Sequence, residues 1–156
     1  MQLSNQLKDP KKQKRHYSGK KKRHTQKAQV IINPKTMEII ATAFSRGKKH
    51  DFKLFKENYS DVASTIKCLA DSGYQGIAKI HSNSQTPKKK SKHHPLTREE
   101  KARNRALAKA RIYCEHVIGK LKIFRILKEQ YRNRRKRFGL RFNLIASLYN
   151  LSLALK

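Results

Sequence analysis

The stretch formed by residues 68–74 constrains the fold most, because it ends an apolar run on a single carboxylate, Asp71. Residues 65–70 have the length and composition of a buried strand, and the Ser-Gly pair after Asp71 predicts that this strand stops there. A second acid, Glu115, stands in a long segment without proline, which predicts a helix. A strand that ends on one acid and a later helix that carries another predict a mixed α/β fold.

Acidic side chains are rare in this chain, so each one in an apolar or helical setting needs a reason. The sequence has 39 Lys and Arg residues but only 10 acids, which gives a formal net charge of +29. A polyanion would relieve the resulting self-repulsion, so a phosphate backbone is the expected partner. Hard divalent cations prefer carboxylate oxygens, and a two-metal site that cuts phosphodiesters needs several of them. Asp71 and Glu115 therefore predict chemistry on DNA.

The length and apolar content fit one domain. The chain has 156 residues, of which 37% are hydrophobic, enough for a modest core. It contains no run of about 18 apolar residues that could span a membrane, and residues 1–7 lack the apolar region of a secretory signal. Cys68 and Cys114 lie far apart in apolar surroundings, which favours reduced thiols over a disulfide framework and a cytosolic location.

The first half of the chain is predicted to form mainly strands. Residues 28–32 and 37–44 are β-branched runs, and the turn sequence Asn-Pro-Lys-Thr between them predicts an antiparallel hairpin. Residues 51–59 place aromatic side chains at helical spacing and predict a short helix. We expect another short helix in residues 75–81. The polar, lysine-rich residues 82–96 indicate a mobile loop, with at most a brief strand near residues 88–90.

The last sixty residues read as helices. Thr97, with Glu100 three positions later, forms a capping box that begins a helix reaching to about Leu127. One stripe of this helix is apolar and consists of Leu107, Cys114, Val117, Ile118 and Leu121. A second helix, from about Arg137 to Leu155, is apolar nearly all round after Phe142, which predicts burial.

Four motifs in this order resemble the RNase H-like catalytic core of DDE insertion-sequence transposases. They are residues 17–25 (Tyr-Ser-Gly-Lys-Lys-Lys-Arg-His-Thr), Gly47 with His50 and Asp51, residues 70–74 (Ala-Asp-Ser-Gly-Tyr), and Glu115 with Gly119 and Lys122. The motifs are similar to those of the subgroup that also underlies Harbinger-type elements. The resemblance covers almost the whole chain, and the sequence separation of Asp71 and Glu115 fits the family's Asp-to-Glu spacing.

The resemblance implies an α/β, RNase H-like fold: a mixed sheet with a β-hairpin and flanking helices, a helical C-terminal part, and a truncated opening strand. Residues 1–27 would be a basic arm with a remnant of that strand, and residues 28–156 a partial catalytic domain. The family's first catalytic aspartate would fall at or before Met1. Asp9 does not match it, being next to Pro10 in a basic run. The chain thus resembles the downstream part of a transposase from a frameshifted or decayed element.

By resemblance, the function is metal-dependent cleavage and strand transfer of DNA at insertion-sequence ends. Asp71 and Glu115 would be both catalytic residues and ligands of Mg²⁺ or Mn²⁺. The implied partners are DNA, as element ends and as target, and either a homo-oligomer or an upstream transposase segment, with no membrane. The implied location is a bacterial-type cytoplasm, in association with the nucleoid.

Each acid also has a purely structural interpretation. Asp71 could cap the turn at Ser72-Gly73, and Glu115 could form an ion pair with Arg111, one helical turn earlier. Asp51 is explained by the dipole at a helix start, and we favour that structural role. Asp51 and Asp9 nevertheless stay open as substitutes for the missing first acid.

Cations and one tyrosine form the predicted DNA contacts. A Tyr among Lys and Arg suits phosphate contact with base stacking, although a solvated arm is the alternative. Arg111 and Lys122 stand near Glu115 and could hold phosphate, and the run before the last helix reads as further phosphate contacts. The predicted DNA-binding residues are Tyr17, Lys20, Lys21, Lys22, Arg23, Arg111, Lys122, Arg134 and Arg135.

Two other functions compete with the transposase hypothesis. A noncatalytic basic nucleic-acid-binding protein, such as a small ribosomal or chromatin-associated protein, fits the composition equally well but does not explain the ordered acidic motifs. A metal-dependent nuclease of the same fold shares the acids and differs only in its substrate.

Overall fold

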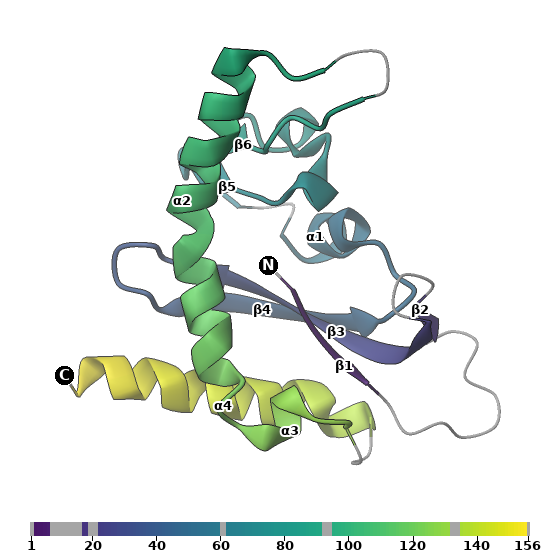
Figure 1. The fold of residues 1–156 in the computed structure, drawn as a ribbon. Helices are drawn as coiled ribbons and strands as arrows, with labels where there is room; N and C mark the ends of the chain where they lie inside the picture. The colour runs from purple at the N-terminus through teal and green to yellow at the C-terminus, as the bar shows by residue number, and fades with distance from the viewer. Residues whose placement is uncertain are drawn as a thin grey trace. The chain divides into compact units, whose positions relative to one another are not determined.

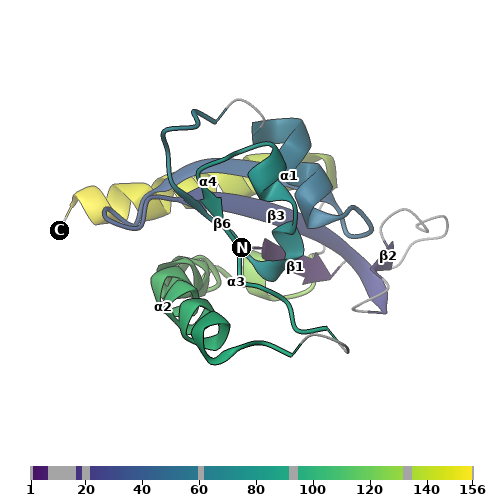
Figure 2. The same ribbon diagram turned by 90° about the horizontal axis from the view of Figure 1, so that it is seen from above.

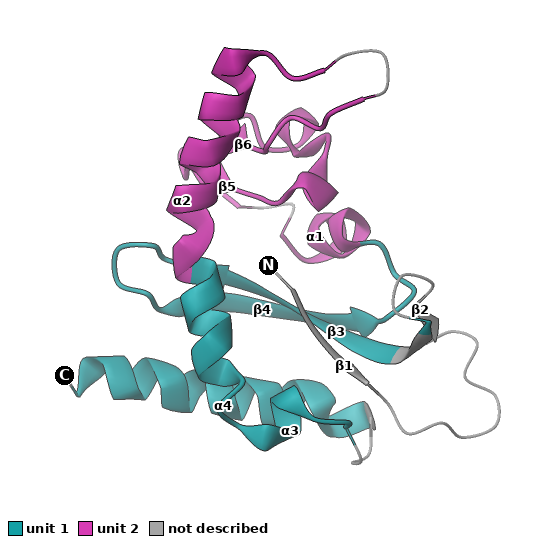
Figure 3. Cartoon of the chain, viewed as in Figure 1, with its two compact units in different colours: residues 1–50, 114–156 teal, residues 51–113 magenta. Residues whose placement is uncertain are grey.

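The computed structural model describes residues 2–6, 17–18, 22–59, 62–91, 95–131 and 135–155. The chain forms two compact units, which Figure 3 colours separately. Unit 1 comprises Met1–His50 and Cys114–Lys156, and unit 2 comprises Asp51–Tyr113. Both units contain helices and strands, which confirms the mixed α/β class.

Unit 1 is built on an antiparallel sheet centred on β3 (Arg23–Ile32). β3 pairs on one side with β4 (Ile39–Arg46), and on the other with β1 (Gln2–Gln6) and β2 (Tyr17–Ser18). The predicted hairpin is confirmed, but β3 begins well before residue 28. The sequence did not predict this extension, because the apolar run begins only at Ala28. Backbone pairing with β1 and β4 nevertheless includes the polar and basic residues that precede Ala28.

Helix α4 (Phe138–Ala154) lies along the β3–β4 hairpin, as Figures 1 and 2 show from two directions. Phe44 of β4 meets Phe138 and Phe142 edge-on, with ring centroids 5.8 and 5.4 Å apart. Gly139 permits this approach, because a Cβ there would lie 3.0 Å from Cδ2 of Phe44. The buried core of unit 1 consists of Ala28, Val30, Ile39, Val117, Ile118, Leu121, Leu127, Tyr131, Phe138, Phe142, Ile145, Ala146 and Tyr149.

Polar side chains fix the position of α4 against β4. The Asn150 amide accepts a hydrogen bond from the Ile39 N–H and donates one to the Ile39 carbonyl, both at 2.9 Å. Thr42 Oγ1 donates to Asn143 Oδ1 at 2.7 Å. The Asn150 bonds satisfy backbone groups of β4 on the side that has no partner strand within the described sheet.

The predicted burial of the last helix is wrong for one of its faces. Phe142, Ile145, Ala146 and Tyr149 are buried, but the large apolar side chains on another face are exposed. The exposed residues are Leu140, Leu144, Leu148, Leu151 and Leu155. The sheet can cover only one side of a helix, so an all-round apolar sequence does not guarantee all-round burial.

Helix α2 (Arg98–Leu121) begins with the predicted capping box. Thr97 N–H donates to Glu100 Oε2 at 3.0 Å, and Glu100 N–H donates to Thr97 Oγ1 at 3.2 Å. The helix ends at Leu121 rather than near Leu127, and α3 (Arg125–Lys128) follows after a turn. Leu121 and Leu127 would lie about 120° apart on one straight helix, so the break lets both enter the core.

Unit 2 begins with α1 (Asp51–Tyr59), as predicted. Its apolar core contains Leu54, Phe55, Tyr59, Tyr74 and Ile77, all buried. The Phe55 ring packs against Tyr59 and Tyr74, with centroids 5.5 and 6.0 Å away.

The rest of unit 2 before α2 has little regular structure. Of the strand predicted for residues 65–70, only β5 (Cys68–Leu69) forms, and it is half-buried. It pairs in parallel with β6 (Ser84–Gln85), so the brief strand expected near residues 88–90 was misplaced. Two short 3₁₀ helices, η2 (Ser72–Tyr74) and η3 (Ile77–Lys79), lie between them, the second within the helix predicted for residues 75–81.

Both cysteines are free thiols and half-buried, as expected for reduced cysteines outside a disulfide. Burial raises the pKa of the Cys68 thiol. Among the described residues, no helix is long and apolar enough to cross a membrane.

Candidate functional site

Asp71 stands where β5 gives way to η2. Its extended backbone makes it the N-cap of η2, and its Oδ1 accepts a hydrogen bond from the Ser72 N–H at 2.5 Å. Arg111 of α2 approaches the same oxygen, with Nη1 at 3.5 Å. The Asp71 side chain is 48% exposed, whereas that of Arg111 is 20% exposed. The predicted capping role is therefore real, and it leaves the carboxylate accessible to solvent.

Asp51 lies beside the same turn. It is in the first turn of α1, as the structural interpretation predicted. A Cβ on Gly73 would lie 3.8 Å from Asp51 Oδ2, so the Asp51 carboxylate and the Asp71–Gly73 turn are neighbours within unit 2. Two acids thus belong to one short region of this unit.

Glu115 is an exposed residue of α2. The alternative predicted for it, an ion pair with Arg111, does not form among the described residues, because Arg111 pairs with Asp71 instead. Asp71 belongs to unit 2 and Glu115 to unit 1, so their convergence on a metal stays a prediction.

The predicted DNA-contact residues are spread over several elements. Lys122 is exposed just after α2, and Lys22 is exposed in a turn with a φ of 48°. Tyr17 lies in β2, Arg23 begins β3 and Arg135 begins η4 (Arg135–Arg137). Lys20, Lys21 and Arg134 lie outside the described residues.

A cationic face on the first half of α2 was missed by the sequence analysis. Arg98, Lys101, Arg105 and Lys109 are exposed and recur at helical spacing, which places them on one side of α2. The segment at Lys88 is tied to the same helix. Lys88 N–H donates to Asn104 Oδ1 and Asn104 Nδ2 donates to the Lys88 carbonyl, both at 2.9 Å. The spacing of the cations was visible in the sequence, whereas the Asn104 contact was not.

The described residues contain no cluster of three or more His, Cys, Asp or Glu side chains that could hold a metal ion. His93 and His94 lie outside the described residues. The predicted ligands Asp71 and Glu115 are carboxylates, the donor type that hard divalent cations prefer. Strand β1, with the sequence Gln-Leu-Ser-Asn-Gln, contains no acid.

Residues 4–150 match the sequence model of the DDE superfamily endonucleases. Since this match covers nearly the whole chain, the protein belongs to that family. It is also 53% identical over 148 residues to the "probable transposase for insertion sequence element IS702" of Microchaete diplosiphon. The match covers 94% of this chain and 54% of that relative, so the chain spans about half the relative's length. No solved structure shows a significant match.

Proposed function

We propose that this chain is the catalytic part of a DDE transposase of the Harbinger-related subgroup, with an RNase H-like fold. It would cut DNA and transfer strands at insertion-sequence ends. The family match and the transposase relative support this function, and neither supports a noncatalytic ribosomal or chromatin-like protein. The observation that carries the proposal is that residues 4–150, nearly the whole chain, match the DDE superfamily endonucleases.

Asp71 and Glu115 are the proposed ligands of Mg²⁺ or Mn²⁺. The Ser72 N–H and Arg111 both engage Oδ1 of Asp71, which orients a carboxylate that is still half exposed. Glu115 is also exposed. A bound ion would supply charge at the phosphate and lower the pKa of water. Arg111 offsets the charge of Asp71, and its guanidinium would suit a phosphate oxygen if the carboxylate held a metal ion.

Metal binding by this chain tests the ligand assignment directly. We expect Mn²⁺ binding, followed by calorimetric titration, to be abolished or weakened at least tenfold in Asp71→Asn and in Glu115→Gln. Glu99→Gln and Glu129→Gln are matched controls, because both remove an exposed acid outside the proposed site. Unchanged Mn²⁺ affinity in Glu115→Gln would show that Asp71 acts without it.

A third acid is needed for two metals, because three carboxylates hold them in the family that this chain resembles. Asp51 is the first candidate within this sequence, since its carboxylate neighbours the turn after Asp71. Asp9, outside the described residues, is the second, and the alternative is an acid from a segment beyond this sequence. Mn²⁺ stoichiometry in Asp51→Asn distinguishes them: loss of one ion assigns Asp51, and no change leaves Asp9 or an added segment.

Catalysis is tested on DNA that carries the terminal repeats of the element. Metal-dependent cleavage or joining should disappear in Asp71→Ala and Glu115→Ala and persist in Glu129→Gln. If the chain is inactive alone, fusion to an upstream segment that carries an aspartate strand should restore activity. Cleavage that survives the loss of both Asp71 and Glu115 would reject the DDE mechanism.

DNA binding would use the cationic face of α2 in addition to the residues predicted from the sequence. Removing one cation that binds a phosphate should lower the slope of log K against log salt by about 0.9. We expect Lys101→Ala/Arg105→Ala/Lys109→Ala, and Lys20–Arg23 changed together to Ala, to lower that slope. The control triple Lys35→Ala/Lys48→Ala/Lys128→Ala removes scattered exposed lysines, and an equal decrease there would refute a defined face. Asp71→Ala should leave the slope unchanged.

A further inference from the structure

Residues 88–90 are three consecutive lysines, which we define as the lysine segment. Asn104 of α2 binds the main chain of this segment through a matched pair of hydrogen bonds. It accepts one from the Lys88 N–H and donates one to the Lys88 carbonyl, both at 2.9 Å. Glu100, one helical turn earlier, pairs with the Lys88 ammonium group. The lysine segment is therefore fixed to one side of α2.

The chain just before the lysine segment is fixed as well. β6 pairs with β5, and the Ala70 N–H donates to the Gln85 carbonyl at 3.0 Å. Gln75 Nε2 donates to the Pro87 carbonyl at 2.9 Å. All of these residues belong to unit 2. Main-chain groups of Gln85, Pro87 and Lys88 thus each have a defined partner, although the lysine segment has no regular secondary structure.

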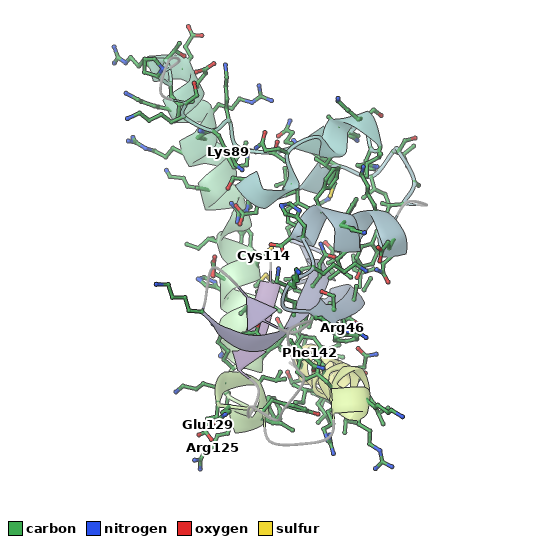
Figure 4. The ribbon with its side chains drawn as sticks, turned by 90° about the vertical axis from the view of Figure 1, so that its right-hand side faces the viewer. Arg46, Lys89, Cys114, Arg125, Glu129 and Phe142 are labelled. Atoms are coloured by element: carbon green, nitrogen blue, oxygen red, sulfur yellow. The ribbon has the colours of Figure 1, made fainter. Side chains whose placement is uncertain are left out.

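The three lysines have different surroundings. Glu100 engages the Lys88 ammonium group, and this hydrogen bond is the main reason why the pKa of the Glu100 carboxyl is held below its usual value. Lys89 and Lys90 are exposed, and Figure 4 labels Lys89 on the segment beside α2. Lys88 is thus an anchor, whereas the ammonium groups of the next two lysines are accessible to a ligand.

The bonds of Asn104 hold like charges together. Lys101, one turn before Asn104, and Arg105, just after it, are exposed cations of α2. Residues 98–109 contain five cations and two acids, and the lysine segment adds three cations. Charges closer than about 10 Å still interact at 0.1 M salt, so these cations repel one another. A contact that works against this repulsion concentrates positive potential at one place, which attracts a polyanion.

We propose that Asn104 is a positioning residue for DNA. It holds Lys89 and Lys90 beside the cationic face of α2, so that both sets of cations contact the phosphates of one duplex. This inference rests on the proposed function, because DNA supplies the phosphates. The Asn104 amide oxygen and nitrogen both bind the main chain of Lys88, so Asn104 acts without touching DNA. Removing its side chain leaves the charge of the protein unchanged but releases the lysine segment from α2.

The salt dependence of binding to a short duplex of arbitrary sequence separates positioning from composition. Each phosphate contact contributes about 0.9 to the slope of log K against log salt. We expect Lys89→Ala/Lys90→Ala to lower this slope by about 1.8, and Asn104→Ala, which removes no charge, to lower it by at least about 0.9. Lys88→Ala should leave the slope unchanged, because the Lys88 ammonium group is bound to Glu100.

A double-mutant cycle tests whether Asn104 acts through the two exposed lysines. If it does, adding Asn104→Ala to Lys89→Ala/Lys90→Ala should not weaken DNA binding further. A residue that contacted DNA by itself would instead weaken binding by the same factor in both backgrounds.

Two more variants separate positioning from a general loss of structure. Gln75→Ala loosens the same segment at the Pro87 carbonyl, and it should lower the slope by less than Asn104→Ala does. Asn58→Ala is the matched control, because it removes an asparagine bond to the Leu54 carbonyl, at 2.8 Å, elsewhere in unit 2. The control should bind DNA like the parent, and all variants should keep the circular dichroism of the parent.

Three outcomes would overturn the inference alone, in a parent chain whose DNA binding weakens with salt. The first is an unchanged slope in both Asn104→Ala and Gln75→Ala. The second is a further loss of affinity when Asn104→Ala is added to Lys89→Ala/Lys90→Ala. The third is a decrease in Asn58→Ala equal to that in Asn104→Ala. A parent chain whose affinity for duplex DNA does not change with salt would instead overturn the proposed DNA binding, and this inference with it.

Discussion

Different kinds of interaction stabilise the interior of unit 1 and the interior of unit 2. Unit 1 buries a continuous apolar cluster between a sheet and α4. Unit 2 has a small ring cluster and secures its long turns by single polar contacts, such as His81 Nε2 to the Ile66 carbonyl at 2.7 Å. Similarly, Gln75 Nε2 donates a hydrogen bond to the Pro87 carbonyl at 2.9 Å. We therefore expect unit 1 to supply most of the stability, whereas the turn that carries Asp71 depends on polar contacts that are individually weak.

The largest effect should come from the core of unit 1. Phe142 is fully buried and its ring meets Phe44 and Phe138; Figure 4 labels it on α4. Phe142→Ala should lower the free energy of unfolding by about 3–5 kcal/mol, because it removes packing interactions and leaves a cavity. Urea unfolding measures this. A decrease below about 1 kcal/mol would show that unit 1 is not the stable part of the chain.

The second prediction concerns the polar anchor of unit 1. Asn150→Ala removes two hydrogen bonds and leaves the N–H and carbonyl of Ile39 without that partner. We expect the free energy of unfolding in urea to fall by about 1–3 kcal/mol, because unpaired backbone groups are costly. Asn143→Ala is the matched control, since the single bond of the exposed Asn143 to Thr42 can be replaced by water. Equal decreases in both variants would contradict the anchor role of Asn150.

The third prediction is a gain of stability in unit 2. The buried Tyr59 hydroxyl has no hydrogen-bond partner among the described residues, and burial raises the pKa of Tyr59 from 10.0 to about 12. Tyr59→Phe should raise the free energy of unfolding by about 1 kcal/mol, because it removes an unsatisfied polar group. Phe55→Leu, a control in the same cluster, should lower it.

Tyr59 also predicts a pH dependence. The raised pKa means that the folded state keeps the phenol proton that the unfolded state loses above pH 10, so stability should fall from pH 10 to about 12. Tyr59→Phe should flatten this part of the profile. A parent profile as flat as that of the variant would show that Tyr59 ionises as easily in the folded chain.

Local patterns in the sequence predicted the elements that depend on neighbouring residues. The hairpin, α1 and the Thr97–Glu100 capping box follow from β-branched runs, helical spacing and cap chemistry, all of which act within a few residues. The end of α2 was predicted too late in the chain, because the break after Leu121 allows Leu127 to be buried. This burial depends on tertiary packing, which local sequence patterns do not show. The exposed face of α4 was misjudged because periodicity gives a helix's apolar arc but not how much of it the sheet covers.

The sequence alone could predict which residues to propose for the candidate site, but not which residues they contact. Asp71 was singled out because an acid that ends an apolar run is unusual in so basic a chain. Its pairing with Arg111 joins residues far apart in sequence, whereas the only partner for Arg111 that the sequence suggested, as an alternative interpretation, was Glu115, one helical turn away. The same holds for β5 and β6, whose parallel pairing joins two polar segments with little strand character.

The smallest effect should come from the surface of unit 1. Arg125 Nε donates to Glu129 Oε1 at 2.7 Å across one turn of α3, and the pair lies at the outside of the molecule in Figure 4. Both side chains are at least half exposed, so solvent screens their attraction and ordering two long side chains offsets it. Arg125→Ala and Glu129→Ala should therefore leave the melting temperature unchanged at moderate salt. A clear drop in each single variant, with no further drop in the double variant, would show that surface ion pairs contribute to unit 1 beyond its apolar core.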